Sequence, residues 1–429
     1  YALAIAAHVV GNPPWGISTR GLVTLALGLA AATLVHRPSA RSLWAAVASL
    51  QLLTVWLQMP VLGNHWLLMG FFSLAVLFAL PRREPWKWLA PTVGTIFVVF
   101  YAFAAFAKLN SAFVDPSVSC GLFYGNELLG SWGLPPVPAT AGAAWLPVIA
   151  ALLAEISVVV LLLFRRTRTL GVALAAAFHF IISADLAQHF YDFTAVLFVG
   201  LAVLASPETT RRIEAWGERR RPTFNVLVVV WATLVVAATL PLSVVGLLLT
   251  RIVVFAAWLP LGAGVVWCAL RGAGKPAVRS PWPPDVVAAG LAALVVLNGL
   301  TPYLGVKNAT GFNMYSNLVT ADGHSNHLLL RRTVNLVDGG YVRIIDSDSA
   351  GLQLYADGGW LVPERNLRHY LAEHPGVGVV FRRADGSTVA GRGAQLGESM
   401  PLLVRKLLPL RSIDPASPAR CQTGWLPAL

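Results

Sequence analysis

Lys108 is the residue with the clearest chemical potential, because it is the single charged side chain in the apolar run FVVFYAFAAFAKLN, residues 97–110. The chain has five lysines, and only this one interrupts a hydrophobic run. At helical spacing its face also carries Tyr101, Ala104 and Ala105, so the two residues nearest to the lysine on that face are small. Two interpretations remain open. The lysine either extends from a helix end to a bilayer surface, or is a buried amine that acts as a base.

Histidines and acids near other apolar runs extend this pattern. His65 lies in GNHW beside Asn64, and His179 lies in AAFHF inside an apolar run. Taken singly, His65 could be an ordinary hydrogen-bonded side chain, whereas His179 needs a polar partner because it interrupts an apolar helix. A polar turn follows His179 and carries further candidates: Asp185, His189, Tyr191 and Asp192.

Glu155 is predicted near the middle of another apolar run, LLAEISVV. A charge at that depth costs about 2.5–3.5 kcal/mol on insertion scales, so we expect this carboxyl group to be protonated, paired or facing a cavity. An interhelical hydrogen bond and a catalytic role both remain open for it. The sequence contains no phosphate-binding loop or nucleophile elbow, and the pair His324 and His327 lacks the supporting ligands of a zinc site. We therefore expect no bound metal.

The composition predicts an all-α polytopic membrane protein. Hydrophobic residues make up 56% of the 429 residues and charged residues only 12%. The net charge of +12 does not indicate nucleic acid binding, because the cations are spread over short loops. The expected partner is the lipid bilayer. About ten apolar stretches are long enough to span it: 18–35, 42–59, 65–81, 89–109, 144–164, 168–185, 189–206, 223–242, 243–270 and 285–304.

Basic residues fall in every second connection between these stretches. The basic connections contain Arg37 and Arg41; Arg82, Arg83 and Lys87; Arg165, Arg166 and Arg168; Arg211, Arg212, Arg219, Arg220 and Arg221; and Arg271, Lys275 and Arg279. The positive-inside rule places these loops in the cytoplasm and residues 305–429 outside, with a bacterial plasma membrane as the expected location. This orientation depends on a break at Pro241, which also places Arg251 inside a span. The chain begins at Tyr1 without a Met, so we expect a segment to precede it.

Residues 305–429 have a different character from residues 1–304 and predict a small extracytoplasmic α+β domain. Three stretches are expected to be strands: 340–348, 352–360, and a hairpin over 376–391 that turns at Asp385 and Gly386. Residues 363–374 and 400–410 are expected to form short helices. Cys120 and Cys421 both fall on the predicted outer side, where a disulfide between them could persist.

Four stretches in this order resemble the membrane core of the vitamin K-dependent γ-carboxylase family, including its bacterial relatives with a horizontally transferred transmembrane (HTTM) domain. They are GNHWLLMGFFSLAVL, VVFYAFAAFAKLNSAFVD, LLAEISVVVLLLFRRTRTLGVALAAAFHF and HFYDFTAVLFVGLAVLAS. Together they span about residues 63–206, a third of the chain. A later segment, residues 298–330, is similar to a segment of some bacterial members, but it suggests no chemistry.

The resemblance implies that Lys108 is the catalytic base and that His65, next to Asn64, supports it. His179 matches the family's Phe-His, and we expect His179, Tyr101 and Asn64 to bind the quinol. In the family, the base deprotonates reduced vitamin K, whose reaction with O₂ gives the epoxide and a strong base. That base removes a γ-proton from a peptide glutamate, to which CO₂ adds. The implied activity is that of a lyase that uses reduced vitamin K or menaquinol, with a peptide or protein acceptor on the outer face.

The chain also departs from the family. Animal members carry two lysines where this chain has Ala107 and Lys108, a Trp where it has Phe113, and a much larger lumenal region. The acceptor could therefore differ even where quinol chemistry is retained. The alternative from another class is a non-catalytic membrane transporter or an assembly protein whose outer domain binds a partner. A transporter would favour polar groups at mid-membrane and broken helices in paired halves, and only Glu155 fits that pattern.

Overall fold

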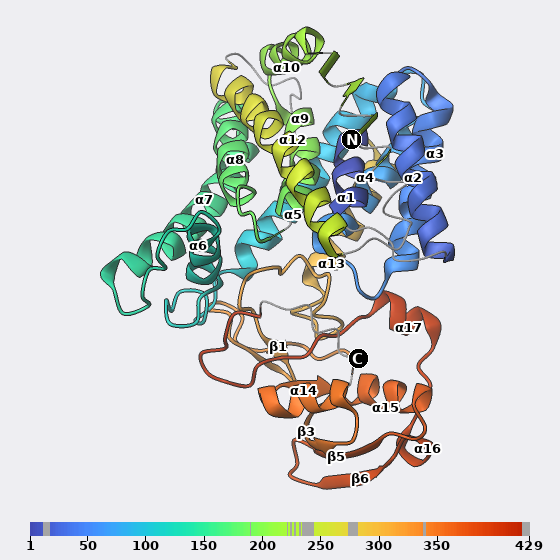
Figure 1. The fold of residues 1–429 in the computed structure, drawn as a ribbon, viewed down its shortest axis with the longest axis vertical. Coiled ribbons are helices and arrows are strands. Elements are labelled where there is room, and N and C mark those ends of the chain that lie inside the picture. Colours follow the sequence, from blue (N-terminus) through green and yellow to red (C-terminus); the bar gives the residue numbers. More distant parts are fainter. Residues whose placement is uncertain are drawn as a thin grey trace.

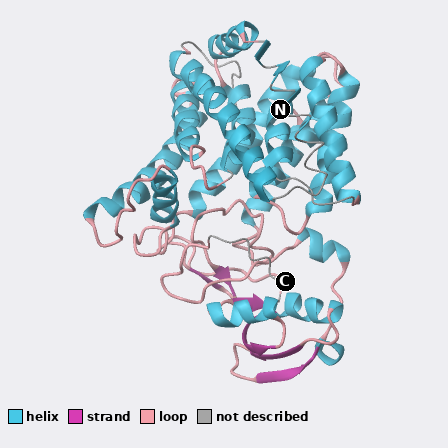
Figure 2. Ribbon diagram, viewed as in Figure 1, coloured by secondary structure: helices cyan, strands magenta, loops and turns pink. Residues whose placement is uncertain are grey.

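A computed structural model describes residues 1–11, 18–188, 190–220, isolated positions between 222 and 233, 244–272, 282–337 and 340–422. In this structure a bundle of helices stands on a smaller region that contains all the described strands (Figures 1 and 2). The bundle is formed by helices from residues 1–304, and the smaller region comes from the C-terminal residues. The described part of the chain is thus mainly helical with a small sheet near its C-terminus.

The helices of the bundle follow the predicted apolar stretches closely, with additions at α1, α6 and α10. Their bounds are α1 Ala2–Gly11, α2 Thr19–His36, α3 Arg41–Gln58, α4 Asn64–Ala79, α5 Pro85–Ala107, α6 Cys120–Ser131, α7 Trp145–Leu163, α8 Arg168–Ile182, α9 Phe190–Leu204, α10 Pro207–Arg219, α12 Val244–Arg271 and α13 Val286–Leu300. Helix α10 differs in kind, since polar and charged residues dominate its sequence.

Among the described residues, four helical segments are long and apolar enough to cross a membrane: Thr19–His36, Pro85–Ala107, Gly142–Leu163 and Val254–Arg271. Helices α4, α8, α9 and α13 are apolar but shorter. These segments support the membrane character of the chain, whereas the total of ten spans stays a prediction. The span expected at 223–242 and the break at Pro241 lie outside the described residues. Arg251 falls within α12, but its side chain is not among those described.

Helix α5 lies at the centre of the bundle and packs against α4, α7, α9 and α13. Its first turn begins with Pro85, whose fixed φ suits a helix start. Gly200 of α9 lies directly against Phe97 of α5, where an added Cβ would stand only 2.2 Å from the ring. This small residue lets the two helices approach closely, a device that membrane helices use often.

The two ends of the bundle differ in chemistry. Helix α10 and the last turns of α12 lie at the end of the bundle away from the sheet (Figure 1). They line a recess with Arg211, Arg212, Arg219 and Arg271. The C-terminal region docks on the opposite end, where Lys406 Nζ donates to the Trp56 and Met59 carbonyl oxygens, each at 2.8 Å. The structure therefore gathers these arginines at one end of the bundle and the C-terminal region at the other. Which end faces the cytoplasm stays a prediction.

The C-terminal region contains a four-stranded antiparallel sheet of order β4-β3-β5-β6. Helices α14 and α15 both lie on the side of the sheet that faces the bundle (Figure 1), and their apolar residues join those of β3–β5 in one core. Strands β5 and β6 form the predicted hairpin, in which Gly386 adopts a φ of 85° at the turn. The elements are β1 Thr320–Ala321, β2 His324–Ser325, β3 Tyr341–Ser347, α14 Ala350–Gly358, β4 Leu361–Pro363, α15 Glu364–Glu373, β5 Gly378–Arg382, β6 Thr388–Arg392, α16 Gly393–Leu396 and α17 Leu402–Leu407.

These elements confirm the expected strand at 340–348, the hairpin and both short helices, but the strand expected at 352–360 is wrong. That stretch forms most of helix α14. Leu352 and Tyr355 are three residues apart and both buried, whereas Leu354 is 67% exposed, so the burial follows a helical period and not an alternating one. Gly359 then ends the helix in the left-handed conformation at a φ of 69°.

Candidate functional site

Lys108 caps the C-terminal end of α5 and points into the protein. Its Nζ lies 2.8 Å from Glu155 Oε2 of α7, and the two side chains are only 7% and 10% exposed. The surface-anchor interpretation of Lys108 is therefore wrong, since the amine is buried. The buried amine of Lys108 also has a charged partner. Glu155, expected to be protonated, paired or facing a cavity, is its partner.

A buried lysine–glutamate pair can hold its shared proton on either group. As an ion pair it needs close contact to offset the loss of hydration. When the proton moves to Glu155, Lys108 becomes a neutral amine that can take a proton from a third molecule. The pair is thus chemically competent to accept or deliver one proton inside an apolar bundle.

A second buried polar pair lies on the same face of α5. The Tyr101 hydroxyl group is 2.5 Å from His179 Nε2 of α8, and both side chains are at most 2% exposed. The Thr194 hydroxyl group of α9 donates to the His179 carbonyl oxygen at 3.1 Å. Because Tyr101 precedes Lys108 by about two helical turns, α5 presents both pairs to its neighbours α7 and α8. His179 therefore has the polar partner that its position in an apolar run requires.

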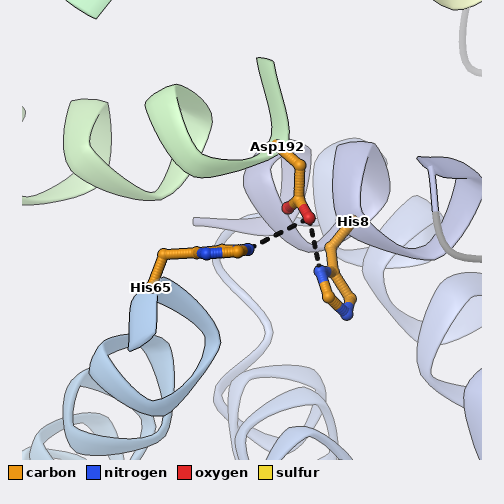
Figure 3. A group of neighbouring side chains, drawn as sticks. All are labelled: His8, His65 and Asp192. Carbon is orange, nitrogen blue, oxygen red and sulfur yellow. Dashed lines mark hydrogen bonds and ion pairs between the residues drawn. The ribbon is translucent and has the colours of Figure 1, made fainter. Parts of the chain in front are cut away.

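His65 lies in a different group. Its Nε2 is 3.1 Å from Asp192 Oδ2, and His8 Nδ1 is 2.8 Å from the same oxygen (Figure 3). The partner that the structure gives His65 is thus Asp192 and not Lys108. Its neighbour Asn64 accepts a hydrogen bond from the Phe312 amide at 2.7 Å, which ties α4 to the C-terminal region. Neither contact reproduces the support of Lys108 that the resemblance implies.

The ring of Phe193 lies between the two groups. Its centroid is 5.8 Å from that of His65 and 5.3 Å from that of His179. The His65 group and the Tyr101–His179 pair are therefore neighbours across one aromatic ring. His8 was missed in the sequence, although it interrupts the apolar run ALAIAAHVV in the same way as His179 interrupts its own. A search for every histidine inside an apolar run would therefore have identified His8 together with His179.

The other candidates of the polar turn have local roles or are not described. Asp185 is buried, and its Oδ1 accepts from the amides of Ala187 and Gln188, which closes the turn after α8. Tyr191 is fully buried, and its ring meets those of Phe255 and Trp258 edge-on or tilted. His189 lies outside the described residues.

The segment at 307–327 covers the end of α5 that carries Lys108. His327 Nε2 is 2.9 Å from the Phe106 carbonyl oxygen, and Asn110 donates to the Ser316 carbonyl oxygen. Within this segment, burial lowers the pKa of Lys307 to about 8. This segment, for which the sequence suggested no chemistry, therefore forms a largely buried cap over the site.

A disulfide lies next to this cap. Cys120, at the start of α6, is bonded to Cys421 with a Cα–Cα distance of 4.8 Å. The Cys120 amide also donates to Asn317 Oδ1 at 2.8 Å, so the loop after α5, the cap and the C-terminal residues meet at one point.

Comparison with family models, with curated proteins and with solved structures found no match to this chain.

Proposed function

We propose that this chain is a membrane enzyme of the quinol-dependent carboxylase and epoxidase type, in which the Lys108–Glu155 pair is the base. The observation that carries the proposal is the pair itself: an amine and a carboxyl group 2.8 Å apart and buried where α5 meets α7. The resemblance of residues 63–206 to the γ-carboxylase family, read from the sequence, supports the choice of this same lysine as the base.

The residues around the pair fit a quinol. A quinol is an apolar ring with two hydroxyl groups, so it needs an apolar pocket, a base at one hydroxyl and a hydrogen-bonding group at the other. Lys108 with Glu155 supplies the base, and Tyr101 with His179 supplies a group that both donates and accepts. The apolar bundle around them favours a lipid-soluble molecule that enters from the bilayer.

In this proposal Lys108 takes a proton from a quinol hydroxyl group after its own proton has passed to Glu155. Tyr101 and His179 orient the ring. O₂ would oxidise reduced vitamin K or menaquinol to its epoxide. The strong base formed in that reaction would remove a glutamate γ-proton, and CO₂ would add to the resulting carbanion. The cap at 307–327 would keep water away from the amine.

The acceptor and the orientation belong to the same proposal. A peptide or protein substrate would approach from the side of the C-terminal region, which lies over the Lys108 end of α5 (Figure 1). We propose that this side is extracytoplasmic and that the membrane is a bacterial plasma membrane, because the arginine-rich recess lies at the other end of the bundle.

The test is turnover of reduced vitamin K or menaquinol to its epoxide by purified wild-type protein, Lys108→Ala and Glu155→Gln. We expect turnover in the wild type and at least a 100-fold loss in Lys108→Ala, the order of magnitude that a general base contributes. Lys87→Ala is a matched control, since Lys87 pairs with Glu84 at 2.6 Å on the surface, with side chains 75% and 60% exposed. Undiminished turnover in Lys108→Ala would refute the role of Lys108, and a wild type inactive with every quinol would refute the enzyme.

The non-catalytic alternative is favoured by one feature of the same pair. A lysine and a glutamate that neutralise each other between two helices also form a good structural link for a transporter or an assembly protein. In that case charge-free replacement of both residues would leave the function of the protein intact. Incorporation of labelled CO₂ into glutamate-containing peptides separates the two, because only the enzyme produces it.

A further inference from the structure

Three helices that are distant in sequence bring two imidazoles and a carboxylate to one point. His8 comes from α1, His65 from the first turn of α4 and Asp192 from the first turn of α9. One nitrogen of each histidine and one oxygen of the aspartate all lie within 4.8 Å of one another. Figure 3 shows both rings directed at the same carboxylate oxygen. The Lys108–Glu155 base of the proposed function does not include these atoms.

Aromatic packing fixes the two imidazoles in this arrangement. The His8 ring stacks on Trp66 with a centroid distance of 3.6 Å and an interplanar angle of 11°. The His65 ring meets Phe193 edge-on, and Gly63 leaves room for it, because a Cβ there would lie 2.7 Å from His65 Cε1. Side chains held this firmly have lost their conformational freedom before any ligand arrives, which favours binding.

We propose that His8, His65 and Asp192 bind one divalent first-row transition-metal ion such as Zn²⁺ or Fe²⁺. Two imidazole nitrogens and one carboxylate oxygen suit these metals, whereas Mg²⁺ and Ca²⁺ prefer oxygen ligands alone. Three protein ligands leave at least one coordination position for water or another small ligand, as in catalytic zinc sites.

The electrostatics of the cluster agree with this assignment. Asp192 is 2% exposed and His8 6%, so the carboxylate has little access to water. A doubly charged cation held by the three side chains would compensate the carboxylate inside the bundle. Imidazole ligands must be unprotonated, so acid should release the ion. The site borders the Tyr101–His179 pair across Phe193, but its existence does not depend on quinol chemistry.

The experiment titrates Co²⁺ and Zn²⁺ into the full chain, purified in detergent and stripped with a chelator. We expect one Co²⁺ per wild-type chain, with visible absorption bands of nitrogen and oxygen coordination, and one Zn²⁺ by elemental analysis. Asp192→Asn and His65→Gln should lose at least 10-fold in affinity. His36→Gln, which alters an exposed histidine at the end of α2, should bind as the wild type does.

Thermal unfolding guards against misfolded variants. Zn²⁺ should raise the melting temperature of the wild type and of His36→Gln, because an ion that binds the folded chain stabilises it. It should not raise the melting temperature of Asp192→Asn, which lacks one of the three ligands. A wild type that binds no Co²⁺ or Zn²⁺ overturns the proposal without reference to any variant. Equal affinity in wild type and in folded Asp192→Asn overturns it as well. Epoxide turnover is measured separately, so either proposal can fail alone.

Discussion

The Lys108–Glu155 pair offers the sharpest test of the structure, because removal of one partner is expected to cost much more stability than removal of both. Lys108→Met and Glu155→Leu each delete one charge and keep an apolar side chain of similar length. Each single variant leaves the other charged group buried at 7% or 10% exposure without its partner. The double variant leaves no buried charge.

The magnitude follows from the geometry. At 2.8 Å, two unit charges attract each other by about 6 kcal/mol if the effective dielectric constant is ~20. Burial of the two groups costs a comparable amount, so the net value of the pair is small, whereas the loss of one partner is expected to cost about 3–5 kcal/mol. We therefore expect each single variant to be destabilised by about that amount. The double variant should lie within about 1–2 kcal/mol of the wild type.

The assay is reversible unfolding in detergent, with the coupling energy taken from the double-mutant cycle. The surface pair Lys87–Glu84 provides the control cycle, in which coupling should stay below about 1 kcal/mol. Additive effects of Lys108→Met and Glu155→Leu would refute the buried pair. A fully stable double variant without epoxide turnover would assign the pair a chemical role beyond stability.

Two further predictions concern the C-terminal region. Cys120→Ser and Cys421→Ser should each lower the free energy of unfolding by about 2–5 kcal/mol, because the disulfide closes a loop with a sequence separation of 301 residues; if reduction leaves the wild type's gel mobility and stability unchanged, the link is absent. Glu364 accepts hydrogen bonds from Arg383 and Arg368 at 2.7–2.9 Å, and these lower its pKa below the ordinary 4.5. Its contribution to stability is therefore present above about pH 4.5 and lost as the pH falls through the lowered pKa. Glu364→Gln should cost about 1–2 kcal/mol at pH 7 and flatten this pH dependence in thermal melts; equal pH profiles of variant and wild type would contradict the network.

Local patterns in the sequence were enough to predict most of the elements. Apolar runs of about 20 residues predicted α2–α5, α7–α9 and α13, since such runs form helices wherever they are buried or in lipid. The turn at Asp385 and Gly386 predicted the β5–β6 hairpin because a glycine there can adopt a positive φ. Where a local pattern was ambiguous, as at residues 352–360, the tertiary contact with β3 decided between strand and helix.

For the candidate site too, local sequence patterns and tertiary contacts each decided a different part. The sequence by itself indicated that Glu155 and His179 need polar partners, because their runs are too apolar for lone polar groups, but it left Lys108 open between a surface anchor and a buried base. Only the tertiary structure decided the partners: Lys108 with Glu155, Tyr101 with His179, and His65 with Asp192. The last group also needs His8, which lies 184 residues from Asp192 in the sequence. The periodicity of a helix shows which residues share a face, but which face meets which depends on how the whole bundle packs.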